Sequence, residues 1–225
     1  MSPLICRPSE ARYTYRSVYP RYTDRYTADR VTQVTITGAR ERLLEAAAQL
    51  TYLNGIDVTG VDAIAKQAGV TKRTLYQHFR SKDELVAAAL QARDEPTIAG
   101  LRAAIDHHIS RGLRPVEALF AVLTLTFAIP GFRGCAFLNA GLEMHADDHL
   151  VRPVTRSHTD ARRNLIADLV HAEGIDDEWV TDAVTLLVEG TLAAGAARRD
   201  TGLVGRAAQS AERILSLARA TPPQP

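Results

Sequence analysis

The 225-residue sequence contains only two cysteines, Cys6 and Cys135, and no Cys-x-x-Cys pair. Two isolated thiols exclude a disulfide framework and suit a reducing compartment. No apolar run approaches the roughly 20 residues that are needed to span a bilayer, and the N-terminus lacks the apolar core of a signal peptide. We therefore expect a cytoplasmic protein without a membrane segment.

The usual signatures of an enzyme are also missing. The sequence has no phosphate-cradling glycine-rich loop and no nucleophile–base pair at a useful spacing. Histidines are frequent in the C-terminal half, but no two of them stand at His-x3-His spacing on one expected helix, and solvated helix ends explain them as well as a metal does. We expect no catalytic site, no metal and no cofactor.

The formal net charge is only +1, so a nucleic-acid-binding footprint has to be local. Residues 40–93 hold eight basic and six acidic side chains, and the basic ones cluster near residues 72–82. Residues 1–37 hold six arginines, five tyrosines and three acidic residues, with few aliphatic residues. We expect a flexible N-terminal extension, which is either an arm that lies on DNA or a tail without a role.

Two short helices around a tight turn are predicted in the middle of the N-terminal half. Gly69 can adopt the positive φ that ends the first helix, and Thr71 is a good N-cap for the second. Leu75 and Phe79 then face inward. The apolar stripe of the first helix consists of Val61, Ile64, Ala65 and Ala68. The second helix leaves a polar face formed by Lys72, Arg73, Thr74, Gln77 and His78. This pattern is typical of a helix-turn-helix, although an ordinary helical hairpin with a solvated face has the same pattern.

The flanking residues favour the helix-turn-helix. An amphipathic helix is expected from Ala39 to Leu53, and Ser81 with Glu84 predicts a capping box for a further helix. Residues 40–92 resemble the tetracycline-repressor (TetR) family of bacterial transcription regulators. The motifs that carry the resemblance are Arg42-Leu-Leu-Glu-Ala-Ala, Gly55-Ile-Asp-Val-Thr-Gly-Val-Asp-Ala-Ile-Ala, Ala68-Gly-Val-Thr, Thr74-Leu-Tyr-Gln-His-Phe and Ser81-Lys-Asp-Glu-Leu.

The resemblance implies an all-α protein that binds double-stranded operator DNA as a homodimer. It implies a DNA-binding domain over residues 38–93 and a larger effector-binding and dimerisation domain over 94–225. We expect Lys72, Arg73 and Gln77 to reach base edges, and the other candidates to contact mainly phosphate; His78 has the alternative of bonding a backbone carbonyl. The full set of DNA-contact candidates is Thr59, Thr71, Lys72, Arg73, Thr74, Tyr76, Gln77, His78 and Lys82.

The second domain is predicted to be helical throughout, because no segment keeps a period of two. Its apolar side chains either line a pocket for a small hydrophobic effector or fill a core; the candidates are Phe120, Leu123, Phe127, Phe137 and Met144. Its two most apolar helices are either central or packed on a second subunit, with Val184, Leu187, Ala194, Ala211 and Ile214 as interface candidates. The resemblance implies a four-helix dimer interface, made of the last helix together with either Val154–Glu173 or Glu178–Arg198. The expected helices are Thr97–Ser110, Pro115–Ala128, Ala136–His145, Val154–Glu173, Glu178–Arg198 and Leu203–Arg219.

These patterns together predict a ligand-responsive repressor that binds a palindromic operator. The alternatives are an activator, or a regulator that a protein partner or the oxidation of Cys135 controls. Cys135 follows Arg133 and precedes an expected helix, both of which favour the thiolate. A lone cysteine is nevertheless more often an inert core residue.

Overall fold

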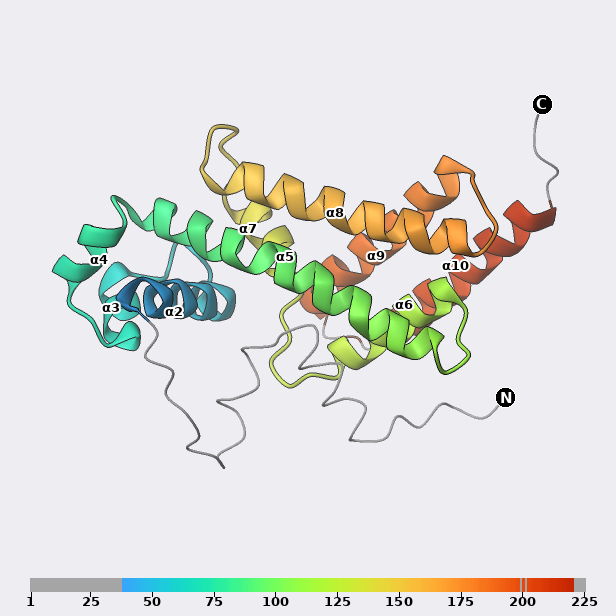
Figure 1. The fold of residues 1–225 in the computed structure, drawn as a ribbon, viewed down its shortest axis with the longest axis horizontal. Helices are drawn as coiled ribbons and strands as arrows, with labels where there is room; N and C mark the ends of the chain where they lie inside the picture. Colours follow the sequence, from blue (N-terminus) through green and yellow to red (C-terminus); the bar gives the residue numbers. More distant parts are fainter. Residues whose placement is uncertain (1–37, 199, 201, 221–225) are drawn as a thin grey trace. The chain divides into compact units, whose positions relative to one another are not determined.

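The computed structural model describes residues 38–198, 200 and 202–220, so the predictions for residues 1–37 and for Cys6 lie outside the described residues. These described residues form helices and no strand, which confirms the all-α prediction (Figure 1). None of their helices is both long and apolar enough to cross a membrane. The helices are α2 (Ala39–Asn54), α3 (Val61–Ala68), α4 (Lys72–His78), α5 (Lys82–Ile109), α6 (Pro115–Phe127), α7 (Ala136–Glu143), α8 (Val151–Ala172), α9 (Glu178–Arg198) and α10 (Gly202–Ala220).

The prediction that a new helix begins at Thr97 is wrong. α5 continues through Pro96. The proline ring is exposed, and the missing N–H removes one backbone donor from the helix. Helix-favouring residues on both sides keep the helix intact, and apolar side chains before and after Pro96, such as Leu85 and Ile105, are fully buried. Packing therefore outweighs the local cost of the proline. α8 likewise begins at Val151 and not at the expected Val154, so Pro153 lies in its first turn, where its missing N–H has no helical acceptor.

The chain divides into two compact units. We call residues 38–96 with 135–159 the N-terminal unit, and residues 97–134 with 160–220 the C-terminal unit. The predicted boundary between residues 93 and 94 falls inside α5, and residues 135–159, which were expected in the second domain, belong to the N-terminal unit. The domain roles remain predictions.

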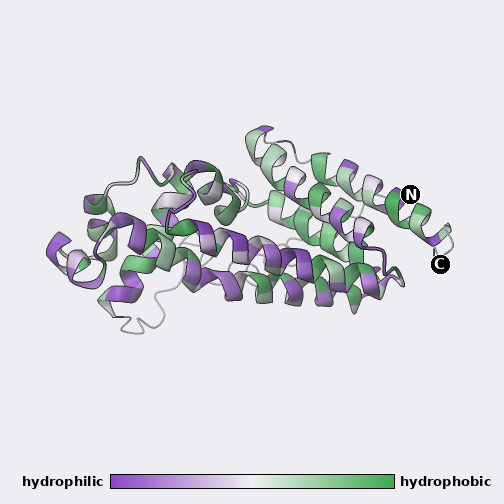
Figure 2. Ribbon diagram, turned by 90° about the horizontal axis from the view of Figure 1, so that it is seen from above, coloured by the Kyte–Doolittle hydropathy of each residue, from purple (hydrophilic) through white to green (hydrophobic). Residues whose placement is uncertain are grey.

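The core of the N-terminal unit holds the helix-turn-helix together. Leu43 of α2, Ile64 of α3 and Leu75 of α4 are fully buried, and Phe79 and Leu85 join the same cluster. Hydrophobic and hydrophilic residues alternate in bands along the helices, as amphipathic packing requires (Figure 2). One shared core thus holds α2, α3 and α4 together.

In the C-terminal unit α10 packs against both α6 and α9. Val184 of α9 and Ala211 of α10 are almost completely buried within the chain. Side chains that are buried in their own subunit offer little surface to a second copy, so the proposed dimer interface below does not use these two residues. Leu187, Ala194 and Ile214 are partly exposed.

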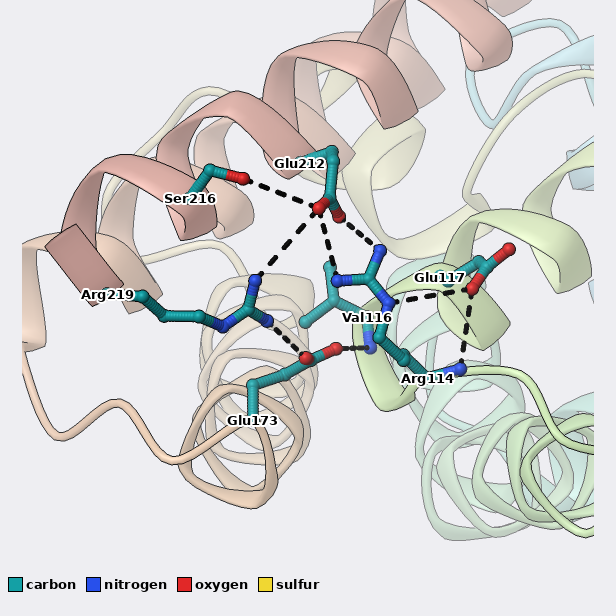
Figure 3. A network of polar contacts seen from close by, with 7 residues as sticks. All are labelled: Arg114, Val116, Glu117, Glu173, Glu212, Ser216 and Arg219. Atoms are coloured by element: carbon teal, nitrogen blue, oxygen red, sulfur yellow. Dashed lines mark hydrogen bonds and ion pairs between the residues drawn. The ribbon is translucent and has the colours of Figure 1, made fainter.

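Charged side chains join the start of α6 to α8 and α10 in the C-terminal unit (Figure 3). Arg114 Nη1 donates to Glu212 Oε1 at 3.1 Å. Glu173, just after α8, accepts the Val116 backbone N–H at 3.1 Å and pairs with Arg219. The Arg114 guanidinium lowers the pKa of the Glu212 carboxyl below its ordinary value, mainly because it donates a hydrogen bond to that carboxylate.

Glu212→Gln is expected to lower the free energy of unfolding at pH 7 by about 0.5–1 kcal/mol, since both side chains are nearly half exposed and solvent screens their attraction. A carboxyl whose pKa is lowered by folding stabilises the protein above the unfolded pKa and loses that contribution as pH falls through the folded pKa. The difference between wild type and variant should therefore shrink as the pH falls below the ordinary glutamate pKa of about 4.3, and vanish once the pH is below the lowered pKa of folded Glu212. Urea unfolding at pH 7 and in the acid range checks this, and a difference that grows as pH falls would contradict it.

Candidate nucleic-acid interface

The turn and caps that were predicted between the helices now labelled α3 and α4 are confirmed. Gly69 has φ of 64°, and the Val70 N–H donates to Ala65 O at 3.0 Å, which closes the end of α3. The Thr71 hydroxyl accepts the Thr74 N–H at 3.1 Å and caps α4. Local chemistry is enough to define this turn.

The two faces of α4 are sharply different. Leu75 is fully buried and Phe79, at its C-terminal cap, is 2% exposed, so this side anchors the helix. Tyr76 is 47% exposed and therefore lies on the outer side. The exposed face consists of Lys72, Arg73, Tyr76, Gln77 and His78, with Thr74 partly exposed. A surface helix with amide, guanidinium and ammonium donors is suited to the major groove of DNA.

Lys72 is not aimed freely outward. Its Nζ donates to Asp62 Oδ2 of α3 at 3.1 Å, and both side chains are more than half exposed. A solvent-exposed pair of this kind is weak. DNA phosphates can therefore compete with Asp62 for the ammonium group.

Asp62→Asn is expected to tighten DNA binding by about two- to fivefold at low salt, because it releases Lys72 and removes a charge that repels phosphate. Titration of labelled duplex by fluorescence anisotropy measures this. In a Lys72→Ala background only the repulsion remains, so the gain should shrink. An equal gain in both backgrounds would show that Lys72 is not restrained by Asp62.

Two predicted phosphate ligands donate to backbone carbonyls in this structure. Thr59 is 3% exposed and its hydroxyl donates to Gly55 O at 2.6 Å, while Gly60 rather than Thr59 is the N-cap of α3. Lys82 is partly exposed, and its Nζ donates to Ile56 O at 2.8 Å. Backbone carbonyls of the α2–α3 loop already bind both side-chain donors, and the two phosphate contacts stay predictions.

The start of α5 differs slightly from the predicted capping box. Ser81 Oγ accepts the Glu84 N–H at 3.0 Å, as expected. Glu84 Oε2, however, accepts the N–H of Arg80 at 2.7 Å rather than that of Ser81. Ser81 thus still caps the first turn of α5, and the Glu84 carboxylate binds the backbone N–H one residue before the expected one.

The sequence did not predict the roles of two arginines that support this surface. Arg42 Nε of α2 donates to Ala68 O at 2.9 Å and so satisfies a carbonyl at the end of α3. The Arg40 guanidinium lies 5.3 Å from the centre of the Phe79 ring, within the range of a cation–π contact. These contacts join residues far apart in sequence, and no local signal identifies them.

The pocket candidates fall in both units. Phe120, Leu123 and Phe127 lie on α6 of the C-terminal unit and are buried. Phe137 and Met144 lie in or beside α7 of the N-terminal unit and are also buried. Burial is compatible with a filled core and with a pocket lining, so the pocket stays a prediction.

Other candidate sites have ordinary contacts. Phe137 stacks on His158 with 3.6 Å between ring centres, and His158 Nδ1 lies 2.8 Å from Asp94 Oδ1, so this histidine belongs to a buried cluster. Cys135, at the N-cap of α7, is 8% exposed. Within the part of the chain that the structure describes, no three acidic, histidine or cysteine side chains could together hold a metal ion.

The fold and the exposed α4 define a helix-turn-helix transcriptional regulator, and comparison with known proteins identifies its family. Residues 43–89 match the family model described as bacterial regulatory proteins, tetR family. A TetR transcriptional regulator of Streptomyces avermitilis is 31% identical, with a TM-score of 0.71 over 81% of this chain and 99% of that one. The chain belongs to the TetR family.

Further relatives agree with this assignment. SCO4454, a TetR-family regulator from Streptomyces coelicolor, is 29% identical, with a TM-score of 0.68 over 80% of this chain and 95% of that one. The transcriptional activator FasR of Mycolicibacterium smegmatis is 44% identical over 66 residues, which are 29% of this chain and 30% of FasR. The chain thus matches less than a third of the length of this curated relative. Its relatives are DNA-binding transcriptional regulators and not enzymes.

Proposed function

We propose that the protein is a homodimeric, ligand-responsive repressor that binds a palindromic operator in the cytoplasm. The observation that carries the proposal is the outer face of α4, where cationic and amide side chains are exposed while Leu75 and Phe79 anchor the opposite side. A helix held in this way can enter the major groove while the rest of the domain stays outside.

The proposed contacts divide by chemistry. Arg73, Lys72 and Gln77 read base edges, since their donors suit guanine and adenine in the major groove. The hydroxyl and imidazole groups that remain exposed or partly exposed bind phosphate oxygens and fix the register. These phosphate candidates are Thr71, Thr74, Tyr76 and His78; Thr59 and Lys82 are omitted because their side-chain donors bind backbone carbonyls.

The proposed dimer seam uses α9 and α10. Trp179 and Leu186 of α9 are 50% and 71% exposed, and Leu217 of α10 is 62% exposed, so both helices present large apolar side chains to water. The partly exposed Leu187, Ala194 and Ile214 lie on the same two helices. Burying such a surface against a second copy would remove it from water, and two-fold symmetry would then require a roughly palindromic operator.

The proposed effector is a small hydrophobic compound that binds among the aromatic side chains of the α6 region. Such a ligand can release DNA only if its affinity differs between the DNA-bound and the free conformations. FasR, whose matched residues are confined to less than a third of each chain, is named an activator, so activation is the second candidate function.

A mobility-shift titration with the DNA that flanks the gene for this protein tests the proposal. We expect a saturable shift with flanking DNA, competed poorly by duplexes of random sequence, and a dimer by analytical ultracentrifugation. A promoter fusion in a host with and without the protein decides between repression and activation. Failure to bind any duplex would refute DNA recognition by α4, and a purely monomeric complex would refute the dimer.

A further inference from the structure

The loop between α2 and α3 is held by a side chain from α7. Glu143, the last residue of α7, directs both carboxylate oxygens at this loop, which belongs to the same N-terminal unit. Oε2 accepts the Ile56 N–H at 2.9 Å and Oε1 accepts the Asp57 N–H at 2.8 Å. One carboxylate thus binds two neighbouring backbone amides, an arrangement that is stronger and more directional than a neutral hydrogen bond.

The same two residues are bound from α5 by the opposite charge. Lys82 Nζ donates to Ile56 O at 2.8 Å and to Asp57 O at 3.3 Å. The amides of Ile56 and Asp57 therefore bind an anion, and their carbonyls bind a cation. Ile56 itself is only 3% exposed, which adds an apolar anchor at the same point.

Gly55 permits this close approach. Its φ of 96° is in the left-handed region, and a β-carbon added there would lie 3.2 Å from Glu143 Oε1. A larger residue would thus be strained and would also press on the carboxylate. The glycine fits both the turn that ends α2 and the position of Glu143.

The loop leads directly into the helix-turn-helix. The Thr59 N–H donates to Ile56 O at 3.2 Å, and Gly60 caps α3. Ile64 of α3 and Leu75 of α4 then share one fully buried core, so a shift of the loop shifts the support of α4. We infer that Glu143 is a positioning residue for DNA binding, which fixes the α2–α3 loop and through it the exposed face of α4. This inference rests on the proposed DNA-binding function.

Glu143→Gln separates positioning from simple charge. The amide side chain has one acceptor oxygen, and its NH2 group would face the second backbone N–H, so the paired bonds cannot both form. Loss of a negative charge alone favours binding to DNA phosphate, whereas loss of position weakens it. The two explanations therefore predict opposite signs.

The experiment compares operator affinity by fluorescence anisotropy for wild type, Glu143→Gln and the control Asp148→Asn, which removes one charge from an exposed position in the α7–α8 loop. We expect about tenfold weaker operator binding for Glu143→Gln, at a temperature well below its unfolding midpoint, and unchanged or slightly tighter binding for Asp148→Asn. If Glu143→Gln binds as tightly as Asp148→Asn while wild type binds the operator, the inference is overturned and the proposed function stands. If wild type binds no DNA, the proposed function itself fails.

Amide hydrogen exchange on the wild-type protein tests the inference without a variant, in case Glu143→Gln does not fold. The backbone amides of Ile56 and Asp57 should exchange at least about 100-fold more slowly than in an unstructured peptide, although they lie outside any helix. Exchange of both amides at the free-peptide rate would overturn the inference.

Discussion

Gly195→Ala is expected to lower the free energy of unfolding by about 2–3 kcal/mol, because α9 and α6 leave no room for a methyl group at this position. A β-carbon built on Gly195 would lie 2.0 Å from Cε1 and 2.6 Å from Cζ of Phe127. Phe127 is 8% exposed and its ring lies 4.8 Å from that of Phe132, so the ring can move only by disturbing its neighbours. Thermal unfolding should show a midpoint that is lower by roughly 5–10 °C.

Gly205→Ala in α10 is the control, because it makes the same change away from Phe127. A β-carbon at Gly205 has no neighbouring atom within 4 Å in the described part of the chain. Because alanine favours a helix over glycine by up to about 1 kcal/mol, this control should leave stability unchanged or raise it. If both variants lose the same stability, then the contact with Phe127 is not the cause.

A double-mutant cycle locates the clash. Phe127→Leu removes the two ring atoms that approach Gly195, so Gly195→Ala should cost much less in that background. Additive losses would contradict direct contact between the two positions. The result also bears on the pocket proposal, since Phe127 is one of its candidate lining residues.

Arg73→Ala is expected to weaken operator binding by about 10- to 100-fold, provided that its guanidinium reads a guanine in the major groove. Arg73 is exposed at the second position of α4, where it can reach a base edge without moving the anchored side of the helix. Random-sequence DNA should lose only the effect of one cation, since phosphate attraction does not depend on sequence. Parallel anisotropy titrations with operator and random duplexes measure both losses.

Two further variants separate base reading from charge. Arg73→Lys keeps the charge but loses the paired N–H donors of the guanidinium, so operator binding should fall while random DNA is bound as before. Lys66→Ala, on the exposed side of α3, removes one charge from the same unit without touching α4. Equal losses on operator and random DNA for Arg73→Ala would assign Arg73 to phosphate.

Much of the DNA-binding unit was predictable because its signals are local. The caps and turn around Gly69 and Thr71 depend on hydrogen bonds between residues three to five apart, which the order of residue types already determines. The burial of Leu75 and Phe79 follows from helical periodicity for the same reason. The sequence by itself therefore determined the helix-turn-helix, its exposed face and the all-α class.

Only the tertiary structure decided what distant segments do to one another. Glu143 binds an amide 87 residues earlier, and Lys82 binds a carbonyl 26 residues earlier, so neither role leaves a periodic or capping signal. Burial of Val184 against its own chain and the passage of α5 through Pro96 likewise depend on packing partners elsewhere in the sequence. Whether a side chain contacts solvent, DNA or a backbone carbonyl depends on which groups the fold brings within a few ångströms of it. Those groups come from distant parts of the chain, so the local sequence cannot predict the contact.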